Sequence, residues 1–320
     1  MRSILTVYRK ELSDHFSSNK FLILLALIYI AGLSSTYVAL TNIREAASSL
    51  DKNVFLYLFT TGGDVLPSFI TFISFFIPII GIIFGFDAIN SERNSGNLSR
   101  VLSQPIYRDS LINGKFLAGI TTLTIIIASI VFIISGVGLF AIGVPPTTEE
   151  ILRIFFFIFI CVFYGGFWMG LSILFSVIME KTAASILTAI AIWIFLMFFL
   201  PIIANATANA MVPLTDSSAI ADQIKNYNIE HMISRISPAT LFTESIIVLL
   251  VPVGGNLLFN AVGYQQSYDM IQSGKMILNP LSLGQSMIQV WPQLVVIIAL
   301  AIICFAASYI IFMRQEIRST

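Results

Sequence analysis

Six long apolar runs, separated by polar segments, dominate the hydrophobic pattern of the chain. A helix needs about 20 mainly apolar residues to cross the ~30 Å hydrocarbon layer of a bilayer. Runs of that length predict six transmembrane helices, at residues 21–40, 66–86, 116–143, 151–179, 185–204 and 292–312. Arg153 is the only charged residue inside them. Membrane spans require this segregation, because a charge at mid-bilayer costs at least ~2.5 kcal/mol.

The overall composition agrees with a membrane protein. Of 320 residues, 57% are hydrophobic and 11% are charged, and the mean hydropathy is +0.91. A soluble globular domain carries about 25% charged residues, so the expected fold is an all-α integral membrane protein. The net charge of zero excludes nucleic-acid binding, which needs a basic surface. Cys161 and Cys304 lie in apolar runs and predict neither a disulfide framework nor a metal site.

The distribution of Lys and Arg predicts the orientation of the chain. Residues 1–20, 87–115, 180–184 and 313–320 together carry 11 of these cations. The alternate segments, 41–65, 144–150 and 205–291, are longer in total but carry only 5. Because cationic loops are retained in the cytoplasm, we expect both the N-terminus and the C-terminus to be cytoplasmic.

Residues 1–20 have the periodicity of an amphipathic helix. Ile4, Tyr8, Leu12 and Phe16 recur every four residues, with most charged residues on other faces. Such a helix lies in the membrane interface before the first span. It serves as a membrane anchor alone, or as an elbow that also contacts a cytoplasmic partner.

The inner loop at residues 87–115 is longer than a connection between two spans requires. It alternates Glu, Arg and Leu, and Pro105 prevents a short helix from continuing. This pattern predicts a segment that a partner binds.

The outer segment 205–291 is also long. It follows the block 21–204, which holds spans one to five, and precedes the sixth span and tail at 292–320. Its stretch 216–235 predicts a solvated helix, whereas residues 241–262 hold two apolar runs that are too short to span. These runs fit re-entrant helices, and two buried helices of a small outer domain explain them nearly as well.

Several kinds of chemistry are missing from the sequence. The six runs contain no Asp, Glu, Lys or His, which argues against an ion-coupled carrier. No zinc-protease motif is present, and no phosphate-binding loop of the form GxxxxGK[ST]. We therefore expect a protein that is not catalytic by itself. The small-residue pairs Gly81/Gly85 and Gly166/Gly170 allow close helix approach, for internal packing or for subunit contact.

Several short motifs then suggest a family. YRKEL at residues 8–12 precedes the first span, and the inner loop carries Glu92-Arg93, Gly96, Leu98, LSQPIYR at 102–108 and Gly114-Lys115. This set resembles the membrane (permease) subunit of type-2 ATP-binding-cassette (ABC) exporters. Within these exporters it is similar to the permeases grouped with the nitrous-oxide-reductase maturation and gliding-motility transporters.

The resemblance implies a role for each motif. The inner loop would be a coupling helix that docks into a separate cytoplasmic ABC ATPase subunit, which would hold ATP and Mg²⁺. The implied ATPase-coupling residues are Glu92, Arg93, Gly96, Leu98, Leu102, Pro105 and Arg108, and the implied elbow contacts are Tyr8, Lys10 and Glu11.

The resemblance also implies a biological setting. The chain would pair with itself or with a paralogous permease in the plasma membrane of a prokaryote, and would export an unidentified substrate. The alternative is a non-transporting subunit that passes conformational work to an extracytoplasmic partner through residues 205–291.

Overall fold

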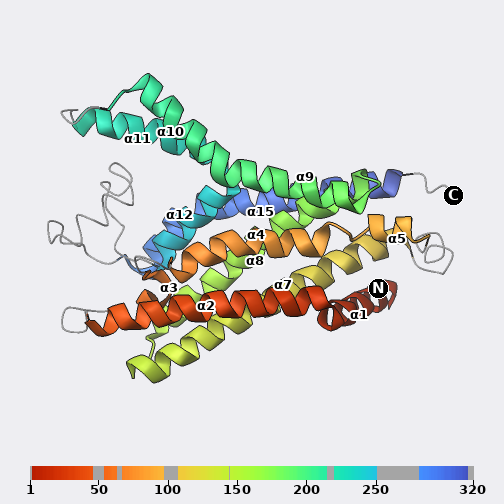
Figure 1. The fold of residues 1–320 in the computed structure, drawn as a ribbon, viewed down its shortest axis with the longest axis horizontal. Coiled ribbons are helices and arrows are strands. Elements are labelled where there is room, and N and C mark those ends of the chain that lie inside the picture. The colour runs from red at the N-terminus through yellow and green to blue at the C-terminus, as the bar shows by residue number, and fades with distance from the viewer. Residues whose placement is uncertain are drawn as a thin grey trace. The chain divides into compact units, whose positions relative to one another are not determined.

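The computed structural model of the chain describes residues 2–45, 54–62, 67–96, 107–143, 145–214, 220–250 and 281–315. Regular structure within these residues is entirely helical (Figure 1). Six helical stretches are long and apolar enough to cross a membrane: Asn19–Ile43, Phe69–Asn94, Arg108–Ile142, Thr148–Ile178, Thr182–Met211 and Leu283–Arg314. The prediction of an all-α membrane protein with six transmembrane helices is therefore confirmed.

The chain divides into two compact units, Met1–Ala191 with Val295–Thr320, and Ile192–Leu294. The first unit contains α1 (Arg2–Ser17), α2 (Asn19–Glu45), η1 (Val54–Leu56), α3 (Tyr57–Thr60), α4 (Phe69–Gly85), α5 (Asn90–Asn94), α7 (Arg108–Ile142) and α8 (Thr148–Ile178). The second contains the π-helix η2 (Phe195–Phe199), α10 (Leu200–Met211), α11 (Ile220–Ser234) and α12 (Pro238–Leu250). The division passes through α9 (Thr182–Ile194) and α15 (Leu283–Arg314), so each of these helices contributes residues to both units.

The centre of the first unit is the contact between α4 and α8. Gly81 and Gly85 of α4 face the backbone of α8, where a Cβ on Gly81 would lie 2.6 Å from the Gly165 carbonyl oxygen. A Cβ on Gly85 would lie 2.7 Å from the Met169 carbonyl oxygen. The Ser172 hydroxyl also donates to the Ile82 carbonyl at 3.0 Å. The pair Gly81/Gly85 therefore serves internal helix packing, as in other membrane bundles where small residues let helices approach.

The amino-terminal turn of α8 carries the one charge predicted inside a span. Arg153 is fully buried, and its Nη2 lies 2.7 Å from Oε1 of Glu149, one turn earlier. Glu150, also buried, completes a capping box with Thr147 and accepts a hydrogen bond from the Phe55 backbone N–H at 3.0 Å. The buried cation is thus neutralised locally, as low-dielectric surroundings require.

Two of the membrane helices extend well beyond the amino-terminal ends of the apolar runs that predict them. The helix α7 begins at Arg108 rather than at 116, and α15 begins at Leu283 rather than at Pro292. Backbone hydrogen bonding continues into polar residues, which hydropathy does not detect. Pro292 lies inside α15. A proline removes one backbone hydrogen-bond donor, and in α15 the helix continues past it.

The second unit is built around the pair α10 and α11. The buried Asn226 side chain of α11 donates to Asn209 Oδ1 and to the Val212 carbonyl, both at 2.8 Å. After α11, the chain bends by 117° into α12. Of the predicted re-entrant region 241–262, the structure describes residues up to Leu250 as helix, and residues 251–262 lie outside the described part. Both interpretations of this region remain predictions.

Replacing Gly81 with Ala tests the close approach of α4 and α8. Because the added Cβ meets backbone atoms, we expect a loss of about 1–3 kcal/mol in the free energy of unfolding, typical of overpacking. Thermal unfolding in detergent measures this loss. The matched control is Gly136→Ala in α7, where an added Cβ has no atom within 4 Å. An equal loss at both positions would contradict the packing role.

Candidate functional site

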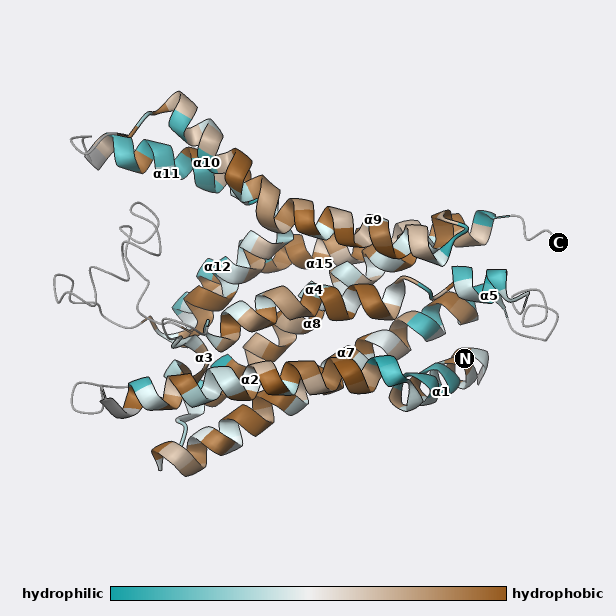
Figure 2. Cartoon of the chain, viewed as in Figure 1, coloured by the Kyte–Doolittle hydropathy of each residue, from teal (hydrophilic) through white to brown (hydrophobic). Residues whose placement is uncertain are grey.

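One end of the first unit gathers the polar segments that the sequence singles out. There α1, α5, the first turns of α7, the last turn of α8 and the end of α15 come together (Figures 1 and 2). Figure 2 shows polar residues on α1 and α5, whereas the helices that lead away from them are mainly apolar. We call this region the polar end.

The helix α1 lies along the beginning of α7. Its most buried side chains are Val7 and Glu11, which lie beside the predicted apolar stripe. A Cβ on Gly114 would lie 2.7 Å from a methyl carbon of Val7, so the glycine permits this contact. Phe16, a member of that stripe, remains 38% exposed. The elbow is thus a packed part of the first unit, and its buried face includes a carboxylate.

Lys115 in α7 joins that carboxylate to α5. Its Nζ lies 3.0 Å from Glu11 Oε2 and 2.8 Å from Glu92 Oε1. All three side chains are at most 16% exposed. The second carboxylate oxygen of Glu92, Oε2, is buried and has no hydrogen-bond partner in the part of the chain that the structure describes. We call Glu11, Lys115 and Glu92 the ionic joint.

The ionic joint changes the acidity of Glu11. Burial by itself would raise the pKa of this carboxyl, but the charges and hydrogen bonds of Lys115 and Lys10 outweigh burial, so the pKa lies below its ordinary value. Glu11 is therefore anionic at neutral pH. The sequence motif places Glu11 beside Lys10 but gives no sign of Lys115, which is distant in the chain and meets Glu11 only through the packing of α1 on α7.

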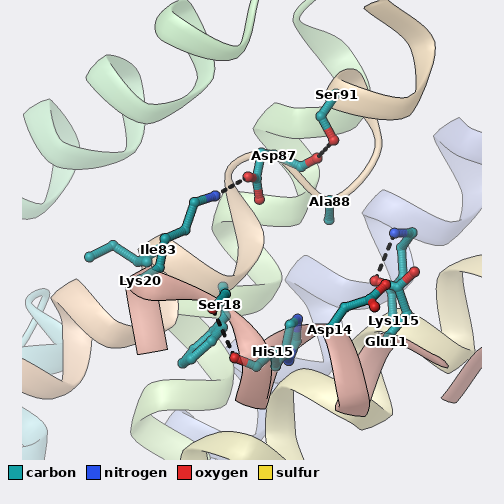
Figure 3. A pocket seen from close by; sticks show the side chains of 11 residues that line it. Glu11, Asp14, His15, Ser18, Lys20, Ile83, Asp87, Ala88, Ser91 and Lys115 are labelled. Atoms are coloured by element: carbon teal, nitrogen blue, oxygen red, sulfur yellow. Dashed lines mark hydrogen bonds and ion pairs between the residues drawn. The ribbon is translucent and has the colours of Figure 1, made fainter. Parts of the chain in front are cut away.

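A polar pocket of about 210 Å³ opens beside the ionic joint (Figure 3). Figure 3 shows Lys20 paired with Asp87 on one side and Lys115 paired with Glu11 on the other. His15 lines the pocket, and its Nδ1 lies 3.1 Å from the Thr122 hydroxyl. Burial lowers the pKa of His15, so its imidazole is neutral at pH 7.

The amino-terminal flank of α5 is fixed to α8. The backbone N–H groups of Ile89 and Asn90 both donate to the buried Ser176 hydroxyl, at 3.0 and 3.2 Å. The helix ends at Asn94, and Gly96 two residues later has a φ of +69°, a left-handed conformation that glycine adopts without strain. The short predicted helix of the inner loop therefore exists in part, and it is attached to the body of the unit.

Two predicted coupling residues, Arg93 and Arg108, bind the end of α15. Arg93 Nη2 donates to Gln315 Oε1 at 2.6 Å, and Arg108 Nη1 donates to the Gln315 carbonyl at 2.8 Å. Gln315 Nε2 in turn donates to the carbonyl of Val177 at 3.2 Å. Neither Gln315 nor Ser176 is singled out by the sequence, because a single polar residue at a helix end is common.

The remaining predicted site residues have varied positions. The Tyr8 hydroxyl donates to Thr121 Oγ1 at 3.2 Å, and Lys10 is exposed and paired with Glu11 and Asp14. Leu98, Leu102 and Pro105 lie outside the residues that the structure describes. The structure therefore brings Glu92, Arg93 and Arg108 to one end with the elbow, and the contact of any of them with an ATPase stays a prediction.

A second charged cluster lies in the second unit. The buried Glu244 of α12 accepts from His231 Nε2 at 3.0 Å, from Arg235 Nη2 at 3.1 Å and from Gln293 Nε2 at 3.3 Å. The donors satisfy both carboxylate oxygens and hold the bend between α11 and α12. Among the described residues, no group of three or more His, Cys, Asp or Glu side chains could hold a metal ion.

Replacing Lys115 with Met tests the ionic joint. Removing the cation leaves two carboxylates in a largely buried site, and we expect a loss on the order of 3 kcal/mol in the free energy of unfolding. Adding Glu92→Gln should recover part of that loss, because one anion is then removed. Lys20→Met, at the more exposed pair with Asp87, is the control and should cost less than ~1 kcal/mol. Equal thermal stabilities of the two lysine variants in detergent would contradict the joint.

The pH dependence of stability tests the environment of His15. The unfolded chain protonates this histidine near pH 6.5, whereas the folded chain resists protonation because the pKa is lowered. The folded state should therefore lose stability as pH falls below about 6.5, by at most ~1.4 kcal/mol per pH unit. Unfolding is measured at pH 7.5 and 5.5 in a His231→Gln background, which leaves His15 as the only histidine. Adding His15→Gln should reduce the difference, and an unchanged difference would exclude His15 as its source.

Comparison with known proteins agrees with the architecture. The model of the family described as "ABC-2 family transporter protein" matches residues 5–317, almost the whole chain. No curated protein matches the chain. The matched region contains the six described helices that are long and apolar enough to cross a membrane, together with the polar end. The chain is therefore a multi-pass membrane protein that belongs to the ABC-2 family of transporter proteins.

Proposed function

We propose that this chain is the permease subunit of an ABC exporter and that it couples ATP hydrolysis on a separate ATPase subunit to movement of a substrate across the membrane. The observation that carries the proposal is the attachment of α5 to three long helices. Ser176 ties α5 to α8, Glu92 ties it to α7 through Lys115, and Arg93 ties it to the end of α15.

This arrangement has the mechanical property that coupling needs. The helix α5 and the first turn of α7 bracket residues 97–106, where the resemblance places the contact with the ATPase. A displacement of α5 is passed to the membrane helices because hydrogen bonds and ion pairs hold it to their ends. Packed helices respond to such a push by shifting as rigid elements. Without a device of this kind, hydrolysis on another chain would not reach the bilayer.

The division of labour between the subunits follows from the sequence. The chain has no phosphate-binding loop, so ATP and Mg²⁺ belong to the ATPase subunit in this proposal. The concentration of Lys and Arg at the polar end and its adjoining loops supports a cytoplasmic position for that end, on the side of the membrane where the proposed ATPase would bind. The membrane is then the plasma membrane of a prokaryote, and the permease pairs with itself or with a paralogue.

The side-chain contacts refine the implied coupling residues. Arg93 and Arg108 direct their guanidinium groups to Gln315, and Glu92 directs its carboxylate to Lys115. We assign these three to holding the coupling region in place, and we assign the direct contact with the ATPase to Leu98 and Leu102. The apolar runs of the membrane helices carry no acidic or lysine side chain, which favours an amphiphilic or lipid-like substrate over a metal ion. The nitrous-oxide-maturation and gliding-motility group remains the proposed subgroup.

Replacing Leu102 with Asp tests the proposed function. A charge in an apolar docking contact should abolish co-purification of the ATPase subunit from native membranes, because a buried unpaired carboxylate is costly. Insertion and thermal stability of the permease should remain. The control is Leu214→Asp, at an exposed leucine outside the inner loop. If no ATPase accompanies the unaltered chain, or if Leu102→Asp retains it fully, the proposal is wrong.

A further inference from the structure

Gln315 connects four elements of the first unit at the point where α15 ends. Its side-chain oxygen accepts from Arg93 of α5, its backbone carbonyl accepts from Arg108 of α7, and its amide nitrogen donates to Val177 of α8. Arg93 Nη2 also lies 3.4 Å from the same Val177 carbonyl. A residue just beyond the last turn of a membrane helix thus contacts α5 through its side-chain oxygen, α7 through its backbone carbonyl and α8 through its amide nitrogen.

The contacts from Arg93 and Arg108 are of the stronger kind. Hydrogen bonds from a guanidinium are charge-assisted and are about twice as strong as those between neutral groups. The Val177 carbonyl is one of the last four of α8, which have no partner within their own helix, and Gln315 supplies one. The group is also part-buried, which weakens competition from water. The end of α15 is therefore held by the coupling region itself.

The contacts of α15 deeper in the first unit differ in character. There the Phe305 ring stacks on Phe116 of α7 with centroids 4.0 Å apart, and the Ser308 hydroxyl lies 3.2 Å from the Gly170 carbonyl of α8. These contacts join α15 to α7 and α8, and none of them involves α5. The described hydrogen bond from Arg93 to Gln315 joins α5 to the end of α15.

We propose that Gln315 is a positioning residue that makes α15 move with α5, so that the sixth membrane helix is a direct output of the coupling region. This inference rests on the proposed function, because it requires an ATPase to displace α5. The helix α15 is continuous from Leu283 to Arg314, and its first part belongs to the second unit. Within the first unit, a displacement at Gln315 is carried along residues 295–314 of that helix, because its backbone hydrogen bonds hold them together.

The experiment compares two nitroxide labels in the complex of the chain with its co-purified ATPase, reconstituted in nanodiscs. Cys161 and Cys304 are first removed, and single cysteines are introduced by Ser95→Cys, at the end of α5, or by Met313→Cys, at the end of α15; both positions are exposed. Electron paramagnetic resonance spectra are recorded with ADP and with ATP, Mg²⁺ and vanadate. In the parent chain, both labels should respond to nucleotide.

Gln315→Leu then separates the two responses. The label at position 95 should respond as before, whereas the response at position 313 should fall at least twofold, because Arg93 loses the Gln315 Oε1 acceptor that joins it to the end of α15. Gln315→Glu should retain most of the response, since a carboxylate still accepts from Arg93. Arg314→Gln, at the exposed neighbouring residue, is the matched control and should change neither label.

The outcomes distinguish this inference from the proposed function and from a purely structural role. An unchanged response at position 313 in Gln315→Leu overturns the inference and leaves the proposed function standing. Silence of both labels in the parent complex overturns the proposed function. A drop in thermal stability with a full response at position 313 would show that Gln315 only fastens the end of α8. If Gln315→Leu does not fold, Arg93→Lys provides the second test, because it keeps the charge but loses the planar fork, and an unaltered response there also overturns the inference.

Discussion

The arrangement of the helices at the polar end depends on the free-energy cost of burying a charged side chain. Lys115 is nearly inaccessible to water, and a buried ammonium is tolerated only beside opposite charges. Its two carboxylate partners come from α1 and α5, which are remote from each other in the sequence. The position of the elbow and the position of α5 are therefore linked to one atom of α7. Few other arrangements of these three helices would leave the lysine paired.

The same physical rule operates at other places in the chain. Arg153 is buried at the start of α8 and binds Glu149 one turn away. In the second unit, Glu244 is buried and held by Arg235 and His231. Each of these pairs lies at a helix end or beside a bend, where neighbouring backbone groups also need partners. The chain thus keeps its membrane helices apolar and uses buried charge to fix their ends.

The restriction of buried charge to the helix ends matters for transport by an ABC-2 protein. Apolar helices in a bilayer gain little from hydrophobic association with one another, and small residues such as Gly81 and Gly85 allow close packing instead. The ionic joint and the contacts of Gln315 hold one end of several helices, so that force applied there acts on all of them. In the function that we propose, these firm ends pass a displacement of α5 to the membrane helices.

The sequence by itself determined the membrane class, the number of crossing helices and the region that carries the polar chemistry. Those properties depend on hydropathy and on local signals, which lie close together in the chain. The family resemblance further drew attention to Glu92, Arg93 and Arg108, and the structure places all three at the polar end. Hydropathy did not predict where some helices begin, for example α15 at Leu283, because backbone hydrogen bonding continues where apolar side chains stop.

Only the tertiary structure decided which charges meet. Nothing in the periodicity of residues 1–20 identifies Glu11 as buried, because its partner Lys115 lies about a hundred residues further along the chain. Gln315 gives an equally weak signal: its importance comes from the convergence of α5, α7 and α8 on the end of α15. Burial and pairing are properties of the packed helices, so they appear only once the chain has folded.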